Sequence, residues 1–173
     1  MASDIDFARL QLQDALDLAI LVEEEAEERY REFATQLEEF QTADAGEFFR
    51  FMAANEAKHG AALSERRKMR FGDAPARVHR GMLWEVEAPN YDRIRAFITP
   101  RRALEVALES EQKAWAYFDQ AIPHIKDPEV RHLFEELREE EVEHQRLVRI
   151  EIDQCPPDSG PDPELRVDEP PAL

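Results

Sequence analysis

The sequence predicts an all-α protein that folds as a four-helix bundle, in which two antiparallel hairpins are joined by one long crossover. Glycine is scarce, with 5 residues in a chain of 173, as expected when most of the chain is helical. In four segments, apolar residues recur every three or four positions, the spacing that places them on one face of a helix. The links between these segments are short, long and short, which indicates two hairpins and a crossover.

The first hairpin is expected to contain a helix over residues 6–40 and a second helix from residue 44 to about residues 71–72. Because the link at 41–43 is short, these helices are predicted to be antiparallel neighbours. Each has one stripe that should face the core: Leu16, Ala19, Glu23, Ala26, Tyr30, Phe33, Leu37 and Phe40 in the first, and Ala45, Phe49, Met52, Glu56, His59 and Leu63 in the second.

The second hairpin has clear signals at both helix starts. Thr99 is predicted to cap the third helix with Pro100 in its first turn, and Asp127 and Pro128 repeat this signal in the fourth. The third helix should end near Pro123, and the fourth before the next pair of prolines. Their stripes are Leu104, Ala107, Glu111, Ala114, Phe118 and Ala121, and then Val130, Phe134, Leu137, Glu141, His144 and Val148.

Residues 71–98 form the crossover between the hairpins. In extended form this stretch is long enough to travel the full length of a helix, so the third helix is predicted to run parallel to the second. Residues 1–153 are therefore predicted to be one bundle domain. Residues 154–173 are rich in proline and acidic groups, and they are predicted to be a disordered tail.

The composition excludes several classes of function. The net charge of -17 argues against binding to nucleic acid or to an anionic membrane surface, whereas it favours the attraction of cations. The single cysteine permits no disulfide within one chain and fits a reducing compartment, so we expect a cytoplasmic protein. The N-terminal residues do not resemble a signal peptide, and no segment is apolar enough to span a membrane.

Ionisable residues interrupt each core stripe near its middle. Four carboxylates that face one another in a core would repel strongly, and their burial without partners would be costly. Two divalent cations would balance the four charges, with one neutral histidine bound to each ion. Two helices contribute a lone Glu and two contribute Glu-x-x-His, which is the pattern of di-iron and di-manganese bundles. The predicted ligands are Glu23, Glu56, His59, Glu111, Glu141 and His144.

The register of these residues matters more than the motif, because Glu-x-x-His is common in a chain rich in glutamate. Glu129 and His132 have the same spacing, but Val130 and Phe134 mark the core face there, so this pair is predicted to lie on the surface. The alternative to a metal site is a bundle with buried polar networks or partly exposed stripes.

The two halves of the chain repeat one another, and the repeated segments resemble a known family. The segments EEEAEERYREFA (23–34), NEAKH (55–59), ESEQKAWAYF (109–118) and EEEVEH (139–144) resemble the rubrerythrin-type branch of the ferritin-like superfamily over roughly residues 10–150. The segment through MRFGD (69–73) is also similar to the soluble ferritin-like domain of membrane-bound iron exporters. The similarity does not extend to the membrane half of those exporters.

The resemblance implies a ferritin-like fold with a di-iron site held by the six residues above, and oxidation of Fe(II) by dioxygen or hydrogen peroxide. Manganese or zinc would also be accepted by such ligands. The resemblance further implies that Tyr30 donates a hydrogen bond to a ligand carboxylate, and that Asn55 and Glu140 orient the histidines.

Two departures from the family leave the reaction open. The four cysteines of a C-terminal rubredoxin are absent, so electrons must come from a separate donor or from Fe(II) itself. Ala114 stands where classical rubrerythrins carry a further glutamate, which puts efficient peroxidase activity in doubt. The alternatives are an iron-binding or iron-delivery protein that works with a shell or membrane partner, and a metal-free helical interaction module.

Surplus apolar residues suggest a further contact surface. Residues 20–22 form the apolar run Ile-Leu-Val, and one stripe of the first helix does not use all three. Residues 82–84, in the crossover, are apolar as well. We therefore expect a homodimer, unless the crossover covers this surface within one subunit.

Overall fold

The computed structural model describes residues 5–40, 46–82 and 99–156. It contains the four long helices that the sequence predicts: α1 (Leu12–Phe40), α2 (Glu47–Phe71), α3 (Pro100–Ala121) and α4 (Pro128–Gln154). Two short 3-10 helices accompany them: η2 (Arg80–Met82) and η4 (Ile122–His124). The predicted link at 41–43, most of the crossover and nearly all of the predicted tail lie outside the described residues.

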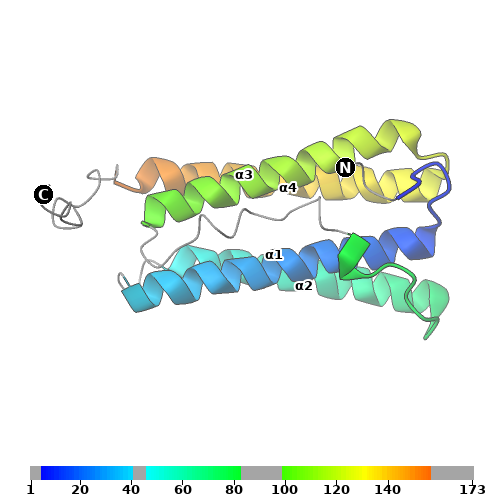
Figure 1. Ribbon diagram of the computed structural model, residues 1–173, viewed down its shortest axis with the longest axis horizontal. Helices are drawn as coiled ribbons and strands as arrows, with labels where there is room; N and C mark the ends of the chain where they lie inside the picture. Colours follow the sequence, from blue (N-terminus) through cyan, green and yellow to red (C-terminus); the bar gives the residue numbers. More distant parts are fainter. Residues whose placement is uncertain (1–4, 41–45, 83–98, 157–173) are drawn as a thin grey trace, which may run out of the picture.

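The helices form two hairpins that lie side by side. α1 packs mainly against α2, and α3 packs mainly against α4. The colours in Figure 1 show that α2 and α3 run in the same direction, opposite to α1 and α4. The architecture is therefore the predicted all-α bundle of two antiparallel hairpins.

The starts of α3 and α4 are those that the sequence predicts. The Thr99 side chain accepts a hydrogen bond from the backbone N–H of Arg102 at 3.1 Å. Asp127 accepts hydrogen bonds from the N–H groups of Glu129 and Val130, at 2.8 and 3.2 Å. Because these signals depend only on neighbouring residues, they are readable from the sequence.

The predicted start of the first helix was wrong by about two turns, because α1 begins at Leu12 rather than near residue 6. Residues 6–9 form a turn, in which the Asp6 carboxylate accepts a hydrogen bond from the N–H of Ala8 at 3.1 Å. Phe7 leaves the path of α1 and packs edge-on against Tyr117 and Phe134 of the second hairpin, with ring centroids 5.6 and 6.2 Å away. Packing against a distant part of the chain thus overrides the local helical pattern.

The start of the crossover is held against the first hairpin by a buried ion pair. Arg67 of α2 contacts the Asp17 carboxylate of α1 at 2.5 Å, and both side chains are largely buried. The same guanidinium donates to the carbonyl oxygens of Gly72 and Ala74, at 3.2 and 2.7 Å. Gly72 has a φ of 57° and ends α2, a conformation that glycine adopts without strain.

The core is divided into two apolar clusters. The first cluster joins the start of α1, the end of α3 and the start of α4, and includes Leu16, Phe118 and Phe134. The second cluster joins the end of α1 with α2, α3 and the end of α4, and includes Phe33 and Phe49. All six predicted ligands occupy the sequence positions between these clusters, so a polar layer crosses the middle of the bundle.

Part of the surplus apolar surface is used within the chain. Val22 belongs to the first cluster, and Leu21 packs against that cluster. The homodimer stays a prediction. Within the residues that the structure describes, no helix is long and apolar enough to cross a membrane.

Candidate metal centre

The polar layer receives side chains from all four long helices. Five of the six predicted ligands are buried, with exposed fractions between 2% and 6%. The exception is His59, whose side chain is 28% exposed. The layer consists of Glu23 on α1, Glu56 and His59 on α2, Glu111 on α3, and Glu141 and His144 on α4.

One group of candidate ligands belongs wholly to the second hairpin. One ligand atom from each of Glu111, Glu141 and His144 lies within 4.8 Å of the other two, and all three residues are buried. The Nδ1 atom of His144 is 3.5 Å from the Glu111 carboxylate. Burial alone would raise the pKa of Glu111, but hydrogen bonds with His144, Glu141 and Tyr30 hold it at about 2. This carboxylate therefore stays charged.

A second group connects the hairpins. It consists of Glu56, His59 and His144, again with ligand atoms within 4.8 Å of one another. The Nδ1 atom of His144 is 3.3 Å from a Glu56 oxygen, and the two imidazole rings are stacked with centroids 5.4 Å apart. Glu56 is therefore within reach of both histidines.

A third group contains a residue that was expected only to orient a histidine. Glu23, His59 and Glu140 satisfy the same 4.8 Å criterion. The Nδ1 atom of His59 is 3.9 Å from Glu23. Burial, assisted by the charges of His144 and Lys58, lowers the pKa of His59, which favours the neutral imidazole that a metal ion requires. Glu140 thus lies among the candidate ligands.

Hydrogen bonds fix the position of Glu111 from two sides. Tyr30 of α1 donates its hydroxyl to the Glu111 carboxylate across the bundle, as the resemblance implies. The side-chain amide of Gln145 donates to the Glu111 backbone carbonyl at 3.3 Å. The contact of Gln145 was not predicted, and its only signal in the sequence is an uncharged polar residue next to the predicted ligand His144. Asn55 is half-buried, and its role stays a prediction.

The surface pair with the same motif lies outside the layer, as predicted from its register. Glu129 is 54% exposed and forms an ion pair with Arg70 at 2.7 Å. His132 is 67% exposed and lies 3.4 Å from Glu136. The helical register, rather than the spacing of Glu and His, therefore distinguishes the Glu-x-x-His pairs in the polar layer from the pair on the surface.

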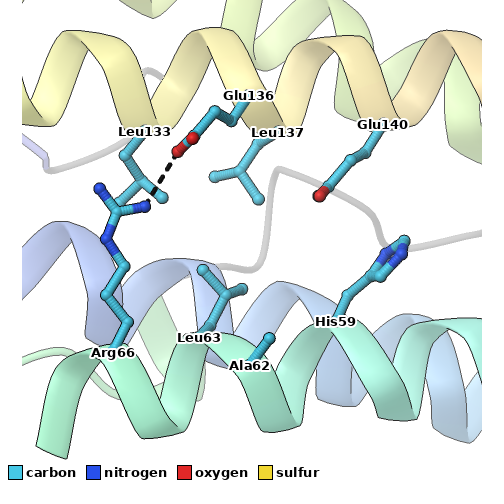
Figure 2. Close-up of a pocket in the computed structure, with 8 residues that line it drawn as sticks. All are labelled: His59, Ala62, Leu63, Arg66, Leu133, Glu136, Leu137 and Glu140. Atoms are coloured by element: carbon cyan, nitrogen blue, oxygen red, sulfur yellow. Dashed lines mark hydrogen bonds and ion pairs between the residues drawn. The ribbon is translucent and has the colours of Figure 1, made fainter. Parts of the chain in front are cut away.

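A groove between α2 and α4 reaches one side of the layer (Figure 2). It has a volume of about 220 Å³. His59 and Glu140 lie at one end, and the ion pair of Arg66 and Glu136, at 2.9 Å, lies at the other. Leu63, Leu133, Leu137 and Ala62 line the part between.

The donor set fits a pair of divalent first-row transition metals. Carboxylate oxygens with imidazole nitrogens suit Fe(II) and Mn(II), and zinc also accepts them. The buried Nδ1 atom of His59 has no hydrogen-bond partner in the part of the chain that the structure describes, so it is available as a ligand. Without cations, burying four carboxylates in one layer of the bundle would have a high electrostatic cost.

The comparisons with known proteins agree with this description. The family model described as rubrerythrin matches residues 14–149. An uncharacterised conserved protein from Magnetospirillum magnetotacticum MS-1 is 28% identical, with a TM-score of 0.71 over 87% of this chain and 99% of that one. A hypothetical protein from Pyrococcus furiosus shares the fold, with 20% identity and a TM-score of 0.59 over 84% of this chain and 90% of that one. No curated protein matches the chain.

Proposed function

The chain belongs to the rubrerythrin family, and on this premise we propose that it is a non-haem di-iron protein that oxidises Fe(II) with dioxygen or hydrogen peroxide. Such a reaction serves iron handling or defence against oxidative stress. The observation that carries the proposal is the polar layer, which contains overlapping groups of carboxylates and histidines from the two hairpins. Most of these residues are buried, and within each group the ligand atoms lie within 4.8 Å of one another.

The residues of the layer have distinct roles in this proposal. Glu56, which groups with both histidines, is the carboxylate best placed to serve both ions. Glu23 on α1 and Glu111 on α3 would each hold one ion, and His59 and His144 would each supply a nitrogen to a different ion. When bound, the iron pair supplies the electrons that reduce the oxidant.

The surroundings of the layer prepare it for this chemistry. Tyr30 and Gln145 fix Glu111 before any ion arrives, so less freedom is lost on binding. The apolar clusters above and below the layer exclude water, and the groove leaves one side open to small oxidants and to cations. In the metal-free protein the charge of Glu111 raises the pKa of His144 against the effect of burial, so ion binding should release a proton there.

Anaerobic titration with Fe(II), followed by addition of dioxygen or peroxide, tests the proposal. We expect about two Fe(II) ions per chain, followed by uptake of the oxidant. Glu56→Ala should abolish the binding of the pair, because it removes the carboxylate within reach of both histidines. Glu129→Ala is the matched control, since it removes an exposed glutamate of the same motif.

Two results would count against the proposal. Wild-type protein that takes up no iron under these conditions would favour the metal-free interaction module. Protein that binds the pair but consumes neither oxidant would favour iron delivery to a partner.

A further inference from the structure

The two sides of the polar layer differ in their access to solvent. The histidine of the second hairpin, His144, has 5% of its side chain exposed, whereas His59 in the first hairpin has 28% exposed. The groove between α2 and α4 ends at His59 and does not touch His144. An ion near Glu23 and His59 would therefore be closer to solvent than one near Glu111 and Glu141.

Glu140 lies where this groove meets the layer. Its neighbour Glu141 is buried among the candidate ligands, and Glu140, one position earlier on the same helix, faces the groove. Figure 2 shows the Glu140 carboxylate and the His59 ring extending toward each other from α4 and α2. A carboxylate oxygen of Glu140 is within 4.8 Å of ligand atoms of both Glu23 and His59.

We propose that Glu140 is a seventh ligand, a carboxylate through which a divalent cation enters and leaves the Glu23–His59 side of the site by way of the groove. This inference rests on the proposed di-metal function and adds to it an order of exchange. The ion on the Glu23–His59 side exchanges first, and the ion held by Glu111, Glu141 and His144 exchanges last.

The charges along the groove favour a cation. The positive charge of Arg66 at the far end is paired with Glu136, which His132 also approaches. Among the described residues, no lysine or arginine forms an ion pair with Glu140. A cation that reaches the inner end of the groove therefore meets the carboxylates of Glu140 and Glu23 together with the His59 ring.

The Glu140→Gln variant distinguishes two roles of Glu140, that of a metal ligand and that of a residue that only orients His59. Glutamine keeps an oxygen that accepts a hydrogen bond from the imidazole, but it loses the charge that binds a cation. Glu139→Gln is the matched control, because it removes the same charge from the exposed neighbouring position. The probe is Co(II), which is not oxidised under anaerobic conditions. Its binding is followed by its absorption of visible light.

We expect wild-type protein and Glu139→Gln to bind two Co(II) ions and to release them to a chelator in two phases. In Glu140→Gln, the affinity of the faster-releasing ion should fall by at least about tenfold, the minimum cost of losing an outer-shell partner, while the slower phase is unchanged. Equal affinities and release rates in Glu140→Gln and Glu139→Gln would overturn the inference and leave the proposed function intact. Wild-type protein that fails to bind two ions would instead overturn the proposed function, and this inference with it.

A second pair of variants tests the path without changing any ligand. Ala62 lines the groove and is exposed, so Ala62→Phe should fill the groove from its solvent side. Uptake and release of the faster ion should slow by the same factor, so that its affinity does not change. Ala61→Phe adds the same ring at an exposed position that does not line the groove. Identical exchange rates in the two variants would rule out this groove as the path.

Discussion

In the α1–α2 hairpin the predicted ligand His59 is partly exposed beside a groove, whereas its counterpart in the α3–α4 hairpin, His144, is buried. The repeat that relates the hairpins also changes seven residues after Glu23 and Glu111, where Tyr30 in the first hairpin corresponds to Phe118 in the second. The Tyr30 hydroxyl donates to Glu111, while the Phe118 ring packs edge-on against Phe134, with centroids 5.4 Å apart. The repeated pattern of glutamate and histidine thus has different surroundings in the two hairpins.

The hairpins also differ in how their helices are tied together. In the first, α1 and α2 are joined by the buried ion pair of Asp17 and Arg67. In the second, α3 and α4 are joined by the ion pair of Asp119 and Arg138, at 2.8 Å. The side chain of Asp119 is 42% exposed and that of Arg138 is 32% exposed. Both hairpins have apolar packing, but the ion pair of aspartate and arginine between the helices is buried in the first and partly exposed in the second.

The largest effect is expected at the buried ion pair. Arg67→Ala leaves the Asp17 carboxylate buried without its guanidinium, and it also removes the donors to the carbonyls of Gly72 and Ala74. We expect the free energy of unfolding to fall by about 3–5 kcal/mol. Urea denaturation measures this loss. A loss below about 1 kcal/mol would mean that the pair behaves like a surface contact.

The next effect concerns the position where the repeat breaks. Tyr30→Phe makes the two hairpins alike at this position and removes a donor to a charged carboxylate, so the metal-free protein should lose about 1.5–3 kcal/mol of unfolding free energy. Tyr117→Phe is the matched control, because the Tyr117 hydroxyl is buried with no hydrogen-bond partner within the described chain. Removing that hydroxyl should cost nothing, and equal losses in the two variants would contradict this reasoning.

The same variant should change the pH dependence of stability. The pKa of Glu111 is lowered from 4.5 to about 2 in the folded protein, so its contribution is present above pH 4.5 and is lost as the pH falls toward 2. In Tyr30→Phe the folded pKa should rise, which makes the loss of stability in this window shallower. Denaturation curves of both proteins between pH 5 and about pH 2 test the change of slope.

A smaller effect is expected at Gly46, which precedes α2 and lies against the backbone of α1. A Cβ atom on Gly46 would lie 2.7 Å from the backbone oxygen of Ala34, which is shorter than any normal contact. Gly46→Ala should therefore cost about 1–3 kcal/mol. At Gly60 the nearest atom would be the Glu23 Cβ at 3.4 Å, an ordinary contact, so Gly60→Ala should be neutral or slightly stabilising. Thermal denaturation compares the two, and similar losses would show that the hairpin backbone adjusts freely.

The smallest effect is expected at the exposed ion pair of the second hairpin. Arg138→Ala should cost about 0–1 kcal/mol, because both charges of the pair remain hydrated when it is broken. When the free energy of unfolding of Arg138→Ala is measured by urea denaturation, as for Arg67→Ala, the two losses compare the hairpins directly. A loss as large as that of Arg67→Ala would remove the contrast.

The sequence was sufficient for features that depend on neighbouring residues or on helical register. Thr99 and Asp127 cap their helices as predicted, and the register excluded Glu129 and His132 from the layer. It could not place Phe7, whose partners Tyr117 and Phe134 are more than a hundred residues away.

Features that depend on the exact approach of two helices were also beyond the sequence. Glu140 was expected to orient a histidine, and its position at the inner end of the groove follows only from how α4 faces α2. The partial exposure of His59 has the same origin. Helical periodicity shows which face of a helix is buried, but it does not show how closely two faces meet.

The division of the core into two apolar clusters has a consequence for the way the protein moves. Each end of the bundle is held by its own apolar packing, whereas the layer between contains four buried carboxylates, whose charges two divalent ions would balance. Without ions, the central turns of the helices should open locally and exchange their amide hydrogens sooner than the turns at either end. The bundle would then be most mobile at its centre, which reverses the usual fraying of helices from their ends.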